Sequence, residues 1–200
     1  MSHQAFSTEL EKWLKSKGDK TLGGLEDVFG QKSFAIAFLL LMFLPALPIP
    51  TGGITHFVLQ PITMLVAIEM IVGRRTIWLP KAAKQRHIGS LLEGKALPFI
   101  MKRIRWFERW SRPRLGSLLD HQAFRSLVGL LVLSLTIAAF LAPPFSGLDT
   151  LPSMGVVIIA LALILEDIVM FIVGMLVGAI GVGLIIGLGA AAGELLQRVF

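Results

Sequence analysis

Acidic side chains within apolar sequence are the residues of this chain best suited to do chemistry. Glu69 lies near the end of one apolar run, shortly before Arg74 and Arg75. Glu166 and Asp167 interrupt another, Leu-Ile-Leu-Glu-Asp-Ile-Val-Met. Intramembrane carboxylates are expensive and usually functional, so a proton or ion path is one interpretation. The alternative is structural: Glu69 pairs with the arginines, while Glu166 and Asp167 form a cytoplasmic turn between two helices.

A Pro/Gly-rich segment before an apolar helix is the second candidate site. If this segment dips into a membrane, the following helix presents free N–H groups and a positive dipole end, which suit an anion. Glycine also permits close approach to the backbone. The predicted substrate-binding residues are Pro50, Thr51, Gly52, Gly53 and His56. An ordinary loop on the far membrane face is the alternative, with His56 as a hydrogen-bonded structural residue.

Patterns for covalent catalysis, cofactors and metals are missing from the sequence. There is no phosphate-binding loop with Gly-Lys-Ser/Thr, no Gly-x-Ser-x-Gly elbow, and no His/Asp/Glu cluster with metal-ligand spacing. The chain also has no cysteine. We therefore expect no enzymatic activity, no cofactor and no metal site.

The composition indicates a membrane protein. Hydrophobic residues make up 54% of the chain and charged residues 16%, and the mean hydropathy is +0.76, well outside the usual range of soluble domains. Between Arg74 and Arg125, thirteen basic residues face three acidic ones, a net charge of +10. Basic loops between membrane segments mark the cytoplasmic side. The apolar flanks disfavour nucleic acid as a partner.

An amphipathic helix is expected within this basic segment, around residues 99–110. Phe99, Ile104, Trp106 and Trp110 share one face, while cations occupy the other. Such a helix can lie in the headgroup region and contact anionic lipids. A cytosolic helix packed on its neighbours is the alternative.

The apolar sequence comes in separate blocks. Residues 33–44 are too few to cross about 30 Å of hydrocarbon, whereas 54–73 are long enough, and a third block runs from 124 to 141. Residues 151–196 suffice for two crossings, with a turn expected between Glu166 and Gly183.

An internal repeat is predicted from a fixed offset of 97 residues. This offset aligns Phe43-Leu44 with Phe140-Leu141 and Glu69 with Glu166. Each half reads as an apolar helix, a Pro/Gly break, a second apolar helix and a carboxylate, and counting of crossings favours repeats that run in the same direction. Interrupted segments in corresponding positions are typical of transporters.

Glycines spaced four residues apart occur in the final apolar block. Small residues at this spacing allow helices to approach closely in lipid, either within the chain or between copies of it. A homo-oligomer would use Gly174, Gly178, Gly183 and Gly187.

The predicted fold is an all-α polytopic membrane protein with two repeated broken-helix hairpins. A basic amphipathic cytoplasmic segment joins the hairpins, and a Gly-rich C-terminal helix follows them. The segments are amphipathic helices (1–32), the first membrane repeat (33–73), the basic segment (74–123), the second repeat (124–171) and the Gly-rich helix (172–200).

Several motifs resemble the ExoD family of bacterial inner-membrane proteins. They are Leu-Pro-Ala-Leu-Pro-Ile-Pro-Thr-Gly-Gly (44–53), Val-Gly-Arg-Arg (72–75), Trp-Leu-Pro (78–80) and Arg-Pro-Arg-Leu (112–115). The resemblance covers roughly residues 20–195. It implies a multi-pass protein of the bacterial inner membrane that takes part in exopolysaccharide or cell-envelope synthesis, and it supplies no catalytic residues.

Three functions are compatible with these features. The first is transport or lipid-carrier handling of an anionic substrate, such as a lipid-linked phosphate or sugar intermediate. The second is a non-catalytic scaffold for polysaccharide machinery. The third is a small cation or proton antiporter that uses Glu69 and Glu166. Pro/Gly breaks at mid-membrane would support transport, whereas breaks on the outer surface would favour a scaffold.

We expect a reporter fused at His87 to lie in the cytoplasm, because His87 is within the basic segment. A green fluorescent protein fusion at this position should fluoresce. Periplasmic alkaline phosphatase activity from the corresponding fusion would overturn the assigned topology.

Overall fold

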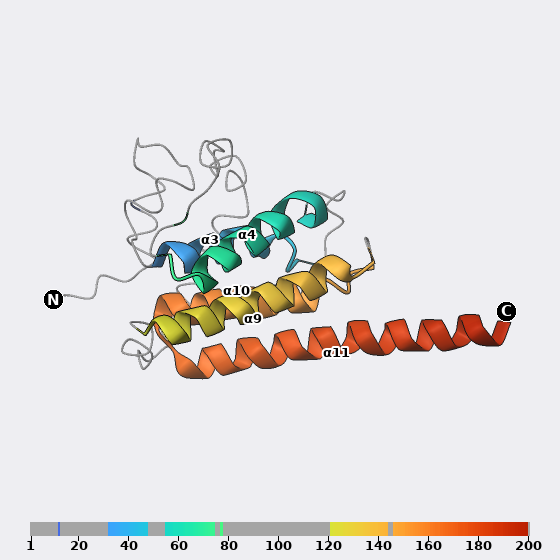
Figure 1. Cartoon of the computed structure of the whole chain (residues 1–200). Helices are drawn as coiled ribbons and strands as arrows, with labels where there is room; N and C mark the ends of the chain where they lie inside the picture. The colour runs from blue at the N-terminus through green and yellow to red at the C-terminus, as the bar shows by residue number, and fades with distance from the viewer. Residues whose placement is uncertain are drawn as a thin grey trace.

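The computed structural model describes Lys12, residues 32–47, residues 55–74, Ile77, residues 121–143 and residues 146–199. All regular elements within these ranges are helical: α3 (Ser33–Phe43), the π-helical turn η2 (Thr55–Leu59), α4 (Gln60–Ile71), α9 (Gln122–Leu141), α10 (Thr150–Leu165) and α11 (Ile168–Val199) (Figure 1). The amphipathic helices predicted within 1–32 and the basic segment 74–123 lie almost wholly outside the described residues.

Four of the helices form a bundle in which each one packs on two neighbours. Helix α3 packs on α4 and α10, and α9 packs on the same two helices. Helices α3 and α9 begin at one end of the bundle, and α4 and α10 begin at the other (Figure 1). The two hairpins therefore run in the same direction, as counting of crossings favours, while the repeat itself stays a prediction.

Helix α3 is the innermost helix because its sequence is apolar all the way round. Phe34, Ile36 and Phe38 are at most 1% exposed. A helix without a polar face must be surrounded by protein or lipid. Its 11 residues measure about 16 Å, so it is too short to cross a membrane, as its sequence predicts.

Helix α4 is preceded by a π-helical turn. Pro61 lies in the first turn of α4, and proline has no N–H to donate to the residue four positions earlier. The preceding residues Thr55–Leu59 are wound as a π-helix. Residues 55–71 are therefore a single helix with a π-helical first turn.

Helices α10 and α11 approach each other at glycines. A Cβ on Gly155 would lie 2.6 Å from the Cα of Gly178, and one on Gly174 would lie 3.1 Å from the carbonyl oxygen of Gly155. Of the two interpretations of the glycine spacing, packing within the chain therefore applies to Gly174 and Gly178. Around Gly183 and Gly187, no atom lies within 4 Å of a built Cβ.

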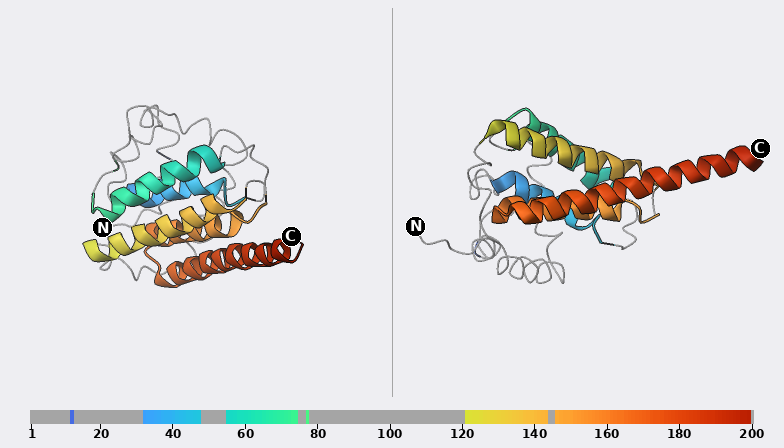
Figure 2. Two further views of the ribbon diagram at one scale, coloured as in Figure 1. Left: turned by 45° about the vertical axis from the view of Figure 1, so that its right-hand side comes forward. Right: turned by 90° about the horizontal axis from the view of Figure 1, so that it is seen from below.

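Helix α11 is longer than the bundle on which it packs. Gly181 lies beside Pro152 at the start of α10, and the rest of α11 projects past the other described helices (Figures 1 and 2). Its side chains Ile180, Leu184 and Ile186 are exposed. Gln122–Leu141 and Ile168–Ala191 are the two stretches of described helix long and apolar enough to cross a membrane.

The C-terminal ends of α4 and α10 have the same backbone conformation, but Glu69 and Glu166 lie at different positions relative to these ends. Gly73 has φ +83 and the N–H of Arg74 donates to the carbonyl of Glu69. Glu166 has φ 58 and the N–H of Asp167 donates to a carbonyl five residues earlier. Both are Schellman-type ends.

This correspondence pairs Glu166 with Gly73 and not with Glu69. The predicted equivalence of Glu69 and Glu166 is therefore wrong by about one helical turn. The first helices agree better with the 97-residue offset, because α3 ends at Phe43 and α9 ends at Leu141.

We expect Gly155→Ala to lower the thermal unfolding midpoint of the purified protein in detergent. The added methyl would collide with α11 backbone, which cannot move aside, at a cost of about 1–3 kcal/mol. Gly183→Ala is the matched control, because its methyl meets open space and alanine favours a helix. Equal destabilisation by both changes would indicate that Gly183 is packed too, between copies of the chain.

Candidate functional site

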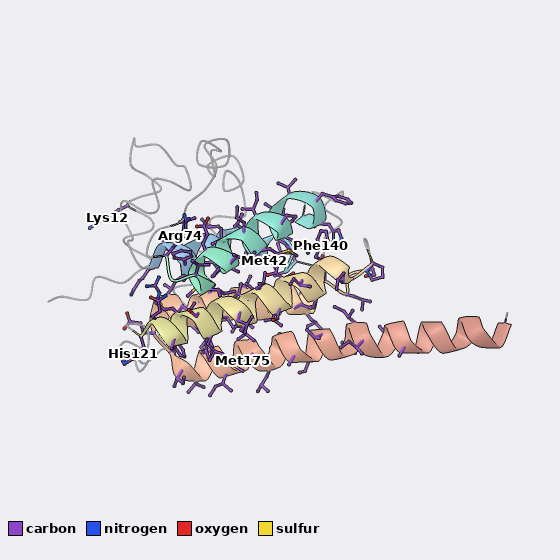
Figure 3. All side chains as sticks on the ribbon, viewed as in Figure 1. Lys12, Met42, Arg74, His121, Phe140 and Met175 are labelled. Atoms are coloured by element: carbon purple, nitrogen blue, oxygen red, sulfur yellow. The ribbon has the colours of Figure 1, made fainter. Side chains whose placement is uncertain are left out.

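The two ends of the bundle differ in the side chains that they carry. We define the charged end by Lys32, Arg74, Arg125, Glu166 and Asp167. Hydrogen bonds bring the start of α9 to the end of α4 here, and an ion pair brings the start of α3 to the end of α10. Figure 3 shows Arg74 and His121 at this end and Phe140 towards the other.

Side chains of α9 complete the end of α4. The guanidinium of Arg125 donates to the carbonyl of Arg74 (2.9 Å), and the hydroxyl of Ser126 donates to the carbonyl of Ile71 (2.8 Å). Arg125 is 8% exposed. A cation at a helix C-terminus also interacts favourably with the helix dipole. These residues therefore join the two predicted halves structurally.

Glu166 is at a helix end and pairs with a lysine. Its carboxylate lies 3.1 Å from the ammonium of Lys32, which also donates to the carbonyl of Ile164 at 3.2 Å. The two side chains are 28% and 43% exposed. Glu166 thus belongs to the turn between α10 and α11, in agreement with the structural interpretation of this residue.

Asp167 caps the start of α11. One oxygen of its carboxylate accepts the N–H groups of Val169 (2.9 Å) and Met170 (3.3 Å). These are the bonds that an N-terminal capping residue makes to the otherwise unsatisfied donors of a helix. A structural role therefore accounts for this aspartate.

Glu69 lies in the last turn of α4, two residues before the helix ends at Ile71, and is 6% exposed. Its ion-coupling role stays a prediction.

The opposite end, which we call the break end, contains Leu44–Leu47, His56, Phe140, Ala142–Pro143 and Ser146–Asp149. The ring of His56 stacks on Phe140, with centroids 4.7 Å apart and planes at 12°. His56 also lies within electrostatic range of the Asp149 carboxylate. The histidine therefore connects the start of α4 with the end of α9 and the start of α10.

The predicted substrate-binding residues are only partly described. His56 is at the break end, as its position next to the Pro/Gly segment predicts. Pro50, Thr51, Gly52 and Gly53 lie outside the described residues.

Two polar residues that sequence reasoning missed are buried near His56 and Asp149. Gln60 and Ser153 are 0% exposed, and neither the amide of Gln60 nor the hydroxyl of Ser153 has a hydrogen-bond partner. An unsatisfied buried polar group costs about 1–3 kcal/mol. The available signal was an uncharged polar residue beside a proline in an apolar run, Gln60-Pro61 and Pro152-Ser153.

The Ser33 hydroxyl, buried at the charged end, also has no hydrogen-bond partner. Two other buried hydroxyls are satisfied within their own helices. Thr63 donates to the carbonyl of Leu59 at 2.8 Å, and Thr136 donates to that of Val132 at 2.7 Å. Among the described residues, no three His, Asp or Glu side chains gather as a metal site would require.

We expect Asp167→Asn to unfold close to the native temperature in detergent and Asp167→Ala to be less stable by about 0.5–2 kcal/mol. Asparagine keeps an oxygen that can accept the N–H groups of α11, whereas alanine does not. If asparagine destabilises the protein as much as alanine does, the charge and not the capping oxygen is the important feature of Asp167.

Comparisons with known proteins agree with the resemblance seen in the sequence. The family described as "Exopolysaccharide synthesis, ExoD" matches residues 6–187. An uncharacterised protein of Synechocystis sp. is 30% identical over 141 residues, which are 68% of this chain and 63% of that protein. The chain thus spans less than two thirds of this relative's length. No solved structure matches. Because the family match extends over most of its length, this chain belongs to the ExoD family.

Proposed function

We propose that this protein is a non-enzymatic, multi-pass inner-membrane transporter or lipid-carrier handler. Its substrate would be an anionic, lipid-linked phosphate or sugar intermediate of exopolysaccharide synthesis, and its site would lie at the break end. The predicted contacts at Pro50, Thr51, Gly52, Gly53 and His56 are part of this proposal. The family and two long apolar helices indicate a membrane protein.

The length of α11 is the observation that carries the proposal. Its apolar stretch runs from Ile168 at the charged end to Ala191. Gly181 is level with the start of α10, because it contacts Pro152. The distance from Ile168 to Gly181 is about 20 Å, and another 15 Å or so of apolar helix follows up to Ala191.

The break end would therefore lie within the hydrocarbon if the apolar stretch of α11 crosses it. If α11 is tilted, the depths spanned by Ile168–Gly181 and by the stretch from Gly181 to Ala191 decrease in the same proportion. The break end therefore stays slightly beyond the midpoint of the apolar stretch. Irregular backbone at such a depth is tolerated only where it is buried in protein or lines a water-filled cavity. Interrupted helices that meet at this depth are typical of substrate sites in transporters.

The positions of the acidic residues favour this proposal over an antiporter. Glu166 pairs with Lys32 and Asp167 caps α11, so two of the three candidate carboxylates have structural partners at the charged end. Glu69 alone is buried within a helix. A scaffold, in turn, has no need of interrupted backbone at membrane depth.

Lipids and a second copy of the chain are the partners that we propose. Exposed apolar side chains cover the outer faces of α9 and α11, which suits lipid contact. Within α11, Gly174 and Gly178 pack inside the chain. A contact between copies would therefore use the open Gly183 and Gly187.

We expect a label at the break end to lie at intermediate membrane depth. Single cysteines at Ser146, Gly147 and Leu141 are convenient, because the native chain has none. Spin labels there should be accessible to a water-soluble relaxation agent, yet lie deeper in reconstituted vesicles than labels at the charged end, such as His121.

A lipid-facing position on α11, Leu176, is the control, since it is 58% exposed on a helix that we expect to contact lipid. Its label should respond to oxygen and not to the water-soluble agent. Break-end labels at the headgroup level would contradict the transport proposal and favour the scaffold.

A further inference from the structure

The unpartnered groups of Gln60 and Ser153 have no explanation in the folding of the bundle. Both side chains are 0% exposed, and three of their polar atoms, the two of the Gln60 amide and the Ser153 hydroxyl, have no hydrogen-bond partner. Buried polar groups in native proteins are almost always satisfied. Each exception to this rule needs a specific explanation, and a ligand that supplies the missing bonds is one such explanation.

The two residues occupy similar places on facing helices. Gln60 is four residues after His56 and Ser153 is four residues after Asp149, so each lies one helical turn further into the bundle than His56 or Asp149, respectively. Helices α4 and α10 lie across the bundle from each other, because both pack on α3 and α9. The polar groups therefore belong to one end of one interior, near the stacked ring of Phe140.

The two unpartnered side chains, Gln60 and Ser153, are themselves uncharged. An amide offers two donors and an acceptor, and a hydroxyl offers one donor and accepts as well. The described lysine and arginine side chains of the bundle, Lys32, Arg74 and Arg125, are all at the charged end. Neutral groups that both donate and accept match alcohol groups, which do the same, better than they match an anion.

We propose that Gln60 and Ser153 bind hydroxyl groups of an uncharged sugar headgroup. This inference rests on the proposed function and assigns the sugar part of its substrate to the described residues of the break end. Any phosphate of the same substrate would then contact other residues. The amide of Gln60 donates to one sugar oxygen and accepts from a second hydroxyl, while the hydroxyl of Ser153 bonds a third group.

Two amphiphiles with the same alkyl chain test the proposal. The probes are n-octyl β-D-glucopyranoside, whose headgroup is a neutral sugar, and octyl phosphate, whose headgroup is an anion. The full chain is held in lauryldimethylamine oxide, which contains neither group, and the thermal unfolding midpoint is measured as each probe is added. A ligand that binds only the folded protein raises this midpoint.

We expect the glucoside to raise the unfolding midpoint of the native protein. Any effect of octyl phosphate on the midpoint should be the same in the native protein and in Gln60→Leu. Gln60→Leu should weaken the glucoside effect about tenfold in probe concentration, as loss of one hydrogen bond implies. Without probe, the same variant should unfold at the native temperature or about 2–4 °C above it, because an unsatisfied group has been removed.

Ser153→Ala removes a single oxygen and carries the test if Gln60→Leu does not fold. Thr136→Val is the matched control. It also removes a fully buried hydroxyl, but one already bonded within its own helix, and it should keep the full glucoside effect. In a strain whose own copy of the gene is deleted, Gln60→Leu should abolish exopolysaccharide production while Thr136→Val supports it.

The inference is overturned if the glucoside has no effect on the native protein, or if its effect survives both Gln60→Leu and Ser153→Ala. It is also overturned if octyl phosphate produces the effect that depends on Gln60, since the site then binds an anion. None of these outcomes bears on the depth of the break end. A headgroup-level depth in the spin-label experiment would instead remove the proposed function itself.

Discussion

Helix ends carry backbone groups that the helix itself cannot satisfy, and a membrane interior offers no water to replace the missing bonds. This constraint is severe for short helices, in which the end groups are a large share of the backbone. Helix α3 has 11 residues and α10 has 16. At the charged end protein groups meet part of this need: Arg125 and Ser126 bond carbonyls at the end of α4, and Asp167 bonds the first N–H groups of α11. These bonds fix which helices are neighbours.

The break end is not completed in the same way. Asp149 precedes α10 without a capping side-chain bond, and Gln60 and Ser153 have polar atoms that no protein group satisfies. The stacked ring of His56 holds α4 and α9 together there.

The sequence predicted the two long apolar helices, because each is encoded by a long apolar run; block 124–141 differs from α9 by two residues at its start. Glycine spacing predicted a close helix contact but not its partner, since Gly155 becomes the partner only in the folded bundle. The 97-residue alignment placed Glu166 opposite Glu69, whereas the helix ends place it opposite Gly73. A fixed offset between two apolar sequences contains no information on where each helix ends. Gln60 and Ser153 were not predicted, because they are buried by helices that are distant from them in the sequence.

Helix α11 projects past the bundle, and this difference in length acts on the surrounding bilayer. Lipids beside α11 meet an apolar surface of about 35 Å, whereas lipids beside the bundle meet one of about 20–30 Å. Bilayers adapt to such hydrophobic mismatch by local thinning, at a cost of a fraction of a kcal/mol per Å. The leaflet next to the break end would be drawn inwards around it. A headgroup would then travel a shorter apolar distance to reach the protein from that side than across an undisturbed membrane.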